Sequence, residues 1–451
     1  MSQTPTVAQL WQDVDDLVTA IAQAPDTQQA ALISQLGEAK HKLNMAVDPM
    51  ARLPLEIQSL IFLAVPPSRN THPYPPHPPP PDPLSTPMVF LQVCQLWRDI
   101  ALATPQLWCN LGMVDLPRSP KYSNLCGYWL SRARSLPVSL SLRGFLALHQ
   151  DVQDLVAQYS SQLESLTLGL VVPDATLIDP DTTLGLEHWR GLELSSLKNL
   201  SLQASDPASF GSIRRWLDVL AAAPMLSRLE LDNVFFEPEN NQELFPSPLR
   251  LASLQDLELG FPFMYDVLGT NGSSSRILRH LTLPALRELS LSVLDVGYGE
   301  LNAFISRSSP PLESLHMAIP FNWSLSSLVQ FLRLIPTLVS LHLSITSPDP
   351  RDAAKLFLLF DTLNTADFLP NLHNVEMYAD LHVPVDYEQM LRLLTFRRTS
   401  CPGRLESFKL QIPEYGPGTP IPPSDHLKSG LRQLMEGGLS LHIGHPSENL
   451  L

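Results

Sequence analysis

LSRLEL, at residues 226–231, is one of nine copies of a six-residue unit, LxxLxL, that repeats with small lapses through most of this 451-residue chain. The copies start at residues 163, 197, 226, 254, 286, 312, 338, 372 and 405, so successive starts lie 26 to 34 residues apart. The last residues of each copy alternate between apolar and polar side chains, as half-buried strands do. Weaker outer copies begin at Val138 and Leu439.

Apolar residues between the copies are spaced as in helices, clearly so over residues 213–220 and 328–335 and less well over residues 354–361. Each repeat is therefore predicted to be strand, loop, helix and turn. Because one such unit cannot bury its apolar face alone, stacked neighbours must supply the core. The fold class expected for residues 113–451 is an α/β solenoid with a curved parallel sheet.

Two helices are expected at the N-terminus, over residues 7–24 and 27–43, with Pro25 between them. The segment 1–47 is interpreted either as a helical hairpin that packs on the next domain or as an oligomerisation segment. Neither helix is long enough for a robust coiled coil.

Residues 48–112 have a different pattern. A helix is expected after Pro54, which suits a first helical turn, and a further helical spacing runs from Val89 to Ile100 and ends at Thr104-Pro105. Between them, residues 66–87 contain eleven prolines, which predicts an exposed polyproline II loop. This loop is interpreted as a surface insertion, or alternatively as a ligand for a proline-reading domain.

Composition narrows the function classes. The formal net charge of −15 disfavours nucleic acid and anionic membranes as partners, and no apolar run approaches a membrane span. The four cysteines match no metal pattern and no disulfide scaffold, which favours a reducing compartment. No signal peptide is expected, so the predicted location is cytoplasmic or nuclear, without a cofactor or metal.

Catalytic motifs lack a supporting context in this sequence. HIGH at residues 442–445 has no Gly-rich strand–helix unit before it, and the loop from Gly269 lacks the Lys that cradles phosphates. Cys94 is expected on an apolar helix beside Trp97, where a thiolate would be disfavoured. The chain is therefore not expected to be an enzyme.

Residues 48–112 resemble the F-box, the three-helix module of cullin-type ubiquitin ligase receptors. The resemblance rests on Leu53-Pro54, Glu56-Ile57, Leu60-Ile61-Phe62, Val93-Cys94, Trp97-Arg98, Ile100-Ala101 and Thr104-Pro105-Gln106-Leu107-Trp108. The gap of 40 residues between Leu53-Pro54 and Val93-Cys94 exceeds the 23 or so usual in the family, and the proline-rich insertion accounts for the excess. With the helical leader and the repeat tail, most of the chain is similar to the expanded F-box proteins of mushroom-forming fungi.

The resemblance implies that one apolar face of residues 48–112 docks onto a Skp-type adaptor and, through it, a cullin ligase core. The adaptor-binding residues it implies are Leu53, Pro54, Ile57, Leu60, Ile61, Val93, Cys94 and Trp97. The alternative is that they form only the core of a small helical domain.

The repeat tail resembles irregular leucine-rich repeats of the F-box-associated type, without an asparagine ladder. Polar residues between the strand leucines should then line a concave recognition face for a target protein. The substrate-binding residues proposed for this face are Arg228, Glu230, Asp256, Glu258, Glu288, His316, His342 and Glu376. Its acidic middle favours a basic target segment, although a merely solvated strand face is the simpler interpretation of any single position.

Together these features lead to the expectation of a substrate receptor of an SCF-type ubiquitin ligase, which tethers an unknown target near the ligase. The rival is a scaffold that binds partners through its repeats and joins no ligase. A stand-alone enzyme is the poorest of the three.

Overall fold

A computed structural model gives the fold. It describes residues 5–65, 87–114, 120–143, 150–170, 189, 191–209, 212–236, 247–260, 274–292, 296–319, 323–345, 359–379, 386–401, 404–412, 422–445 and 448–451. The expected proline-rich loop lies outside these residues except for Pro87, as does most of the stripe over residues 354–361. The chain divides into two compact units, Met1–Leu146 with Gln162–Ser165, and Ala147–Ser161 with Leu166–Leu451.

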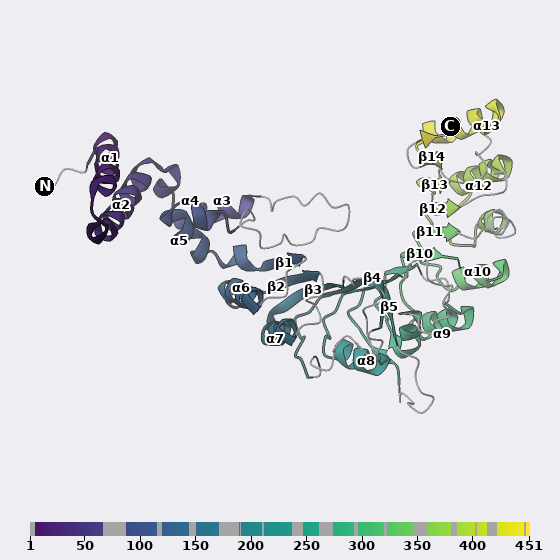
Figure 1. Ribbon diagram of the computed structural model, residues 1–451. Coiled ribbons are helices and arrows are strands. Elements are labelled where there is room, and N and C mark those ends of the chain that lie inside the picture. The colour runs from purple at the N-terminus through teal and green to yellow at the C-terminus, as the bar shows by residue number, and fades with distance from the viewer. Residues whose placement is uncertain are drawn as a thin grey trace. The chain divides into compact units, whose positions relative to one another are not determined.

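The first unit is mainly helical (Figure 1). Its elements are α1 Val7–Gln23, α2 Asp26–Val47, η1 Pro49–Arg52, α3 Leu55–Ala64, α4 Phe90–Val93, α5 Gln95–Ala103, η2 Pro105–Trp108, β1 Asn110–Val114, α6 Pro120–Leu130, η3 Ser131–Ala133 and β2 Val138–Arg143. β1 and β2 pair in parallel. The division between the units passes through η5 Ser160–Gln162 and β3 Leu163–Leu170.

The two N-terminal helices form the expected hairpin. α1 begins with a capping box, in which Thr6 and Gln9 satisfy each other's backbone N–H groups. Leu10 and Val14 of α1 are buried with Leu43 of α2 in a small cluster of their own. The pair of helices is thus held by its own apolar seam.

Residues 48–108 build a second, aromatic cluster. The rings of Phe62 on α3 and Phe90 on α4 stack with centroids 4.0 Å apart, and Trp97 tilts against Phe62 at 5.2 Å. Ile100, Ala101 and Met50 complete the buried set. The indole of Trp97 is also held by a hydrogen bond to a residue outside this cluster, because its Nε1 donates to Asp48 Oδ2 at 2.7 Å.

The expected single helix from Val89 to Ile100 is wrong. Cys94 has φ −158° and ψ 171°, which is extended backbone, so the chain breaks there into α4 and α5. The helical apolar spacing continues across the break, and spacing alone gave no sign of it. Cys94 therefore lies between two helices rather than on one.

The second unit contains the repeats. Its elements are α7 Gln150–Tyr159, β4 Asn199–Ser209, α8 Ile213–Ala221, β5 Arg228–Phe235, β6 Leu249–Arg250, β7 Asp256–Gly260, η8 Ser274–His280, β8 Leu281–Thr282, β9 Glu288–Leu291, α9 Tyr298–Ser308, β10 Ser314–Ala318, α10 Leu325–Leu332, β11 Ser340–Ile345, β12 Asn374–Ala379, α12 Tyr387–Thr399, β13 Ser407–Gln411, α13 Asp425–Glu436, β14 Ser440–His445 and β15 Glu448–Asn449.

Strands of the second unit follow one another in the order β4-β5-β7-β9-β10-β11-β12-β13-β14-β15. Pairing is parallel from β4 to β14 and antiparallel only between β14 and β15. All nine sequence units and both outer copies coincide with strands, which confirms the strand prediction and the parallel α/β fold class.

One backbone contact repeats at the start of successive strands. The carbonyl of Lys198 accepts from the N–H groups of Ser227 and Arg228, and that of Ser227 accepts from Gln255 and Asp256. The same pair of hydrogen bonds to one carbonyl recurs at the starts of β9, β10, β11, β12 and β13, and it keeps the register constant. The unit leucines consequently stack, and Leu229, Leu257 and Leu289 are essentially inaccessible to solvent.

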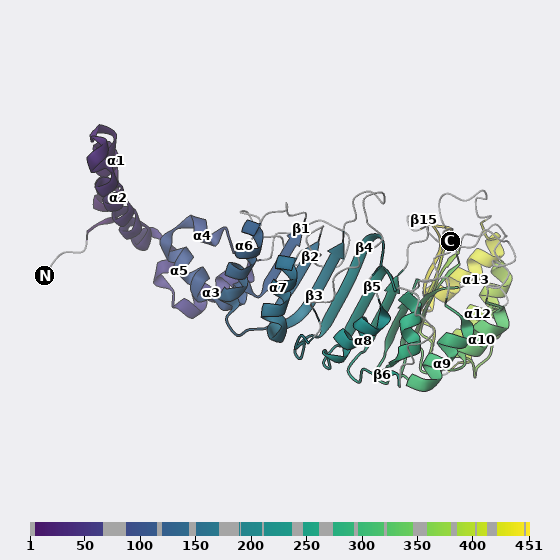
Figure 2. The same ribbon diagram turned by 60° about the horizontal axis from the view of Figure 1, so that its bottom comes forward.

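Helices cover one side of these strands. Figure 1 shows α10, α12 and α13 along the same side of β11 to β14, and the turned view of Figure 2 shows α8 and α9 on that side as well. The helical stripes expected over residues 213–220 and 328–335 correspond to α8 and α10. The other face of the strands carries the polar residues.

The repeats are less regular than expected. Within the described residues, the segment between β5 and β7 holds only the short strand β6, and that between β7 and β9 holds η8 and β8. β6 and β8 pair with each other as a separate two-stranded sheet. The prediction of a helix in each repeat is therefore wrong for the described parts of these two connections.

A buried arginine joins α12 to the preceding repeat. Arg397 is 1% exposed, and its guanidinium donates to the carbonyls of Leu363 at 2.6 Å, Phe368 at 2.6 Å and Leu369 at 3.0 Å. These three bonds satisfy a buried charge and three buried carbonyls at once.

Replacing Arg397 should therefore destabilise this part of the sheet. We expect Arg397→Met to cost about 3 kcal/mol, because three buried carbonyls lose their donors. Arg392→Met, at an exposed position of the same helix, should change stability by less than about 0.5 kcal/mol. Thermal unfolding of the full chain by calorimetry measures both, and equal midpoints for the two variants would contradict this role for Arg397.

Candidate functional site

Two surfaces contain the residues proposed from sequence, one in each unit. The first is the apolar surface formed by residues 53–65 with Val89 and Val93. The second is the polar face of strands β5 to β13. Each is described within its own unit.

The apolar surface exists because α3 is apolar almost all round. Its sequence, LEIQSLIFLA, buries only Gln58 and Phe62 among the residues described. The buried side-chain amide of Gln58 keeps its hydrogen bonds, since its Nε2 donates to the carbonyls of Met50 at 2.6 Å and Leu53 at 2.9 Å. Every other apolar side chain of α3 therefore faces away from this core.

Exposed large apolar side chains are concentrated here. Leu60 is 60% exposed and Val93 51%, and the remainder of the set is Leu53, Leu55, Ile57, Ile61, Leu63, Val65 and Val89. Such a concentration of exposed apolar side chains is typical of interaction surfaces, which makes this one a candidate docking site.

Six of the eight residues expected to bind an adaptor are exposed: Leu53, Pro54, Ile57, Leu60, Ile61 and Val93. Cys94 and Trp97 are only half-buried, and Trp97 packs into the aromatic cluster of Phe62 and Phe90. Leu55, Leu63, Val65 and Val89 are exposed apolar residues that sequence reasoning missed. Their positions on the helix relative to Phe62 could have revealed them once Phe62 was known to be the buried residue.

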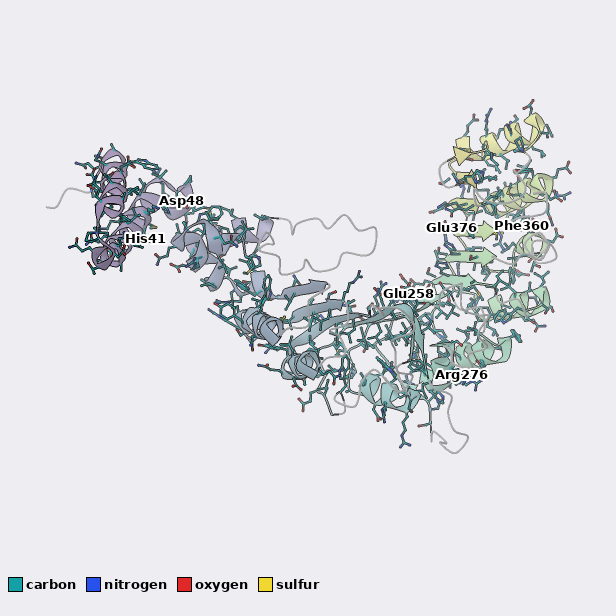
Figure 3. The ribbon with its side chains drawn as sticks, viewed as in Figure 1. His41, Asp48, Glu258, Arg276, Phe360 and Glu376 are labelled. Carbon is teal, nitrogen blue, oxygen red and sulfur yellow. The ribbon has the colours of Figure 1, made fainter. Side chains whose placement is uncertain are left out.

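On the polar face, the register aligns side chains from successive strands into rows. One row contains Arg228, Asp256, Glu288, Ser314, Ser340, Asn374 and Ser407. The neighbouring row, two residues further along each strand, contains Glu230, Glu258, Ser290, His316, His342, Glu376 and Lys409. Figure 3 shows Glu376 on the side of the strands away from the helices and Phe360 on the helix side.

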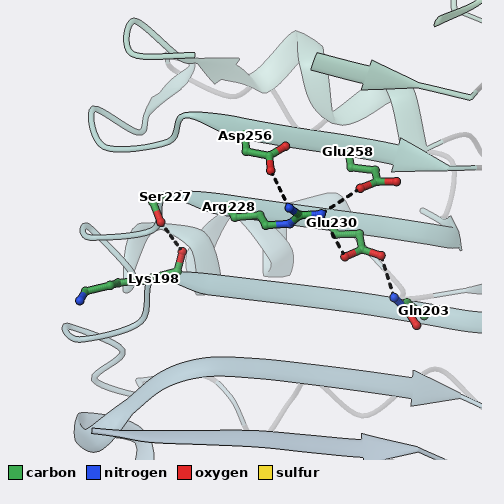
Figure 4. Close-up of polar contacts among 7 residues, drawn as sticks. All are labelled: Lys198, Gln203, Ser227, Arg228, Glu230, Asp256 and Glu258. Atoms are coloured by element: carbon green, nitrogen blue, oxygen red, sulfur yellow. Dashed lines mark hydrogen bonds and ion pairs between the residues drawn. The ribbon is translucent and has the colours of Figure 1, made fainter. Parts of the chain in front are cut away.

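Arg228 is the centre of the acidic part of these rows. Its guanidinium lies 2.9 Å from Asp256 Oδ2, 3.3 Å from Glu258 Oε2 and 3.9 Å from Glu230 Oε2 (Figure 4). The other oxygen of Glu230 accepts a hydrogen bond from Gln203 Nε2 at 2.7 Å. One arginine thus contacts three carboxylates, Asp256 in its own row and Glu230 and Glu258 in the neighbouring row.

The carboxylates nevertheless outnumber the arginine. Burial raises the pKa of Asp256 and of Glu258, with Arg228 opposing the rise and neighbouring acids adding to it. Asp232, two residues beyond Glu230 on β5, also has its pKa raised by burial and by Glu230. A Cβ at Gly260 would meet the Asp232 carboxylate, so a larger residue there would have to displace that side chain. Four carboxyl groups, those of Glu230, Asp232, Asp256 and Glu258, thus lie around a single arginine in this part of the face.

A second group forms where the row crosses β10 to β13. The imidazoles of His316 and His342 stack with centroids 3.9 Å apart. His342 Nδ1 lies 3.6 Å from Glu376 Oε2, and Lys409 Nζ lies 2.9 Å from Glu376 Oε1. The pKa of His316 is lowered to about 4, chiefly by burial and also by the neighbouring His342, while Glu376 opposes the shift.

The structure therefore brings the proposed polar residues together in two groups. Arg228, Glu230, Asp256 and Glu258 make one, and His316, His342 and Glu376 make the other, while Glu288 is exposed beside Asp256. Gln203 contributes to the first group and was not predicted on this face, whereas Lys409, which contributes to the second, was expected on the face by strand alternation although it was not among the eight proposed binding residues. Aligning the LxxLxL units so that equivalent strand positions lie side by side is the step that could have placed both residues beside their partners.

Arg287, a further base near the acidic group, pairs with Glu313 at 2.8 Å at an exposed position. It precedes the strand and joins neither group. In the described part of the chain, no set of three histidine, cysteine or acidic side chains is arranged to hold a metal ion. The same residues include no helix with the length and apolar character needed to cross a membrane.

Comparison with known proteins gives no assignment: no protein-family model matches the chain, and no curated protein matches it. The functional argument therefore rests on the geometry of the two surfaces.

The histidine pair makes stability depend on pH. With a pKa near 4 in the folded chain and about 6.5 when unfolded, His316 binds a proton only after unfolding in this window. Stability should thus fall as pH falls from about 6.5 to 4, and His316→Gln should remove part of that loss. The thermal midpoints of wild type and variant at pH 7 and pH 5 test this.

His426→Gln, an exposed histidine of α13, is the control and should keep the wild-type difference between the two pH values. The raised pKa values of Asp256 and Glu258 act in the opposite sense but are common to all three proteins. An unchanged difference in His316→Gln would show that the stacked histidine does not titrate on unfolding.

Proposed function

We propose that this protein is the substrate-recognition subunit of an SCF-type cullin-RING ubiquitin ligase. The apolar surface of residues 53–65, Val89 and Val93 docks the Skp-type adaptor, and the polar face of the repeats binds the target protein. The protein has no catalytic role of its own. It raises the effective concentration of the target beside the ubiquitin-carrying enzyme.

The observation that carries the proposal is the exposure of the residues that resemble the F-box docking face. A small helical domain whose only function was to fold would bury Leu53, Ile57 and Val93 in its core. Here the core consists of Phe62, Phe90 and their neighbours, and those three residues are left at the surface. Covering them with a partner removes apolar area from water, worth about 25 cal/mol per Å².

The polar face supports the second half of the proposal. It offers an acidic group around Arg228 and a histidine-rich group around Glu376, both on rigid strands. Excess carboxylates around Arg228 suit a basic segment of a target. A receptor of this type would act in the cytoplasm or nucleus, where the ligase core is found.

Adaptor binding is the decisive test. Wild-type protein co-expressed with a Skp-type adaptor should co-purify with it, and Leu53→Asp/Ile57→Asp should weaken binding by roughly a hundredfold or more, because two buried charges would face an apolar partner. Both positions are exposed in the free chain, so the variant should fold normally.

Met225→Asp/Leu334→Asp is the matched control, since it places the same charges on exposed apolar positions of the second unit. It should bind the adaptor like wild type. Absence of the adaptor from the wild-type sample would overturn the ligase proposal and leave the interaction scaffold, which needs only the repeats, as the better account.

A further inference from the structure

A second apolar surface lies on the N-terminal hairpin and has no role in the proposed function. Val7, Trp11 and Val18 of α1 are spaced by four and seven residues, so they share one face of the helix. All three are exposed, Trp11 at 53%. They belong to the same apolar stripe of α1 as Leu10 and Val14, which lie on its inner side and are buried against α2.

α2 adds Ile33, which is 56% exposed, to the same face of the hairpin. On both helices the exposed residue directly follows one that is partly or fully buried, as Trp11 follows Leu10 and Ile33 follows Leu32. Each step along a helix rotates by about 100° in the same sense. Because α1 and α2 run antiparallel, the two rotations lead to the same side of the pair.

The two helices carry opposite charges on this side. Asp15 lies four residues after Trp11 and three before Val18, and Lys40 lies seven after Ile33, so each is on the exposed face of its helix. Among the described residues neither has an ion-pair partner. The Cβ position of Gly37, between Ile33 and Lys40, meets no atom within 4 Å, which leaves room above α2 for a large side chain.

Such a face is complementary to a second copy of itself. Under a two-fold axis parallel to the helices, α1 of one copy lies over α2 of the other, which brings each Trp11 towards the space at Gly37. We propose that this hairpin, defined by Val7, Trp11, Val18 and Ile33, is a homodimerisation surface that closes into an antiparallel four-helix bundle.

The size of the face indicates the strength of the contact. α1 has 17 residues, which at 1.5 Å per residue gives about 25 Å, and two helices side by side are about 20 Å wide. An area on the order of 500 Å² per copy is at the low end of specific interfaces, so the dimer should have a micromolar dissociation constant. Two receptors joined in this way would bind a target with two recognition segments more tightly through avidity.

Sedimentation velocity of the full chain, without adaptor, tests the dimer over roughly 1 to 100 µM, the range set by a micromolar constant. Wild type should shift from monomer to dimer, and Trp11→Asp/Val18→Asp should remain monomeric throughout. Met45→Asp, an exposed apolar position elsewhere on α2, is the matched control and should dimerise like wild type. A wild type that stays monomeric at the highest concentration would overturn the proposal.

Leu53→Asp/Ile57→Asp should still dimerise, so failure of this proposal is distinguishable from failure of adaptor binding.

Discussion

The constant register between parallel strands is the constraint on which the second unit depends. One carbonyl at the start of each strand accepts two N–H groups from the next, and this contact repeats from β4 to β13. Because side chains alternate between the two faces of a strand, a fixed register stacks leucine on leucine on one face. On the other face it necessarily aligns the polar residues into rows.

The rows explain how residues from distant parts of the sequence come to interact. Arg228 reaches Asp256 and Glu258 because β5 and β7 pair without slippage, and Glu376 meets both His342 and Lys409 because β12 lies between β11 and β13. A slip of one residue would turn these side chains into the core and the leucines out. The polar face and the hydrophobic core are therefore two consequences of one arrangement.

The first unit is governed by a different limit. Its helices carry more apolar surface than their small cores can bury, since a small domain has a high ratio of surface to volume. Phe62 and Phe90 occupy the centre of one cluster, and Leu10, Val14 and Leu43 that of the other. What remains outside these clusters, on α3 and on the outer side of the N-terminal hairpin, is exposed apolar surface.

Much of this arrangement could be predicted from local pattern. The LxxLxL units marked every strand of the main sheet between β3 and β13, and Pro25 marked the break between α1 and α2. The same reasoning failed at Cys94, where the apolar spacing continues through a break in the backbone, and in the connections around β6 and β8, where the described segments hold no α-helix. In both places, packing against residues far along the chain outweighed the local preference.

The sequence by itself determined the period of the strands, the leucines that enter the core and the short reach of the N-terminal helices, because alternation and helical spacing are properties of neighbouring residues. Only the tertiary structure decided that Phe62 rather than Leu60 is buried, and that Gln203 and Lys409 join the polar groups. Burial and charge pairing depend on which strands and helices lie side by side, and those partners are 26 or more residues apart in the chain.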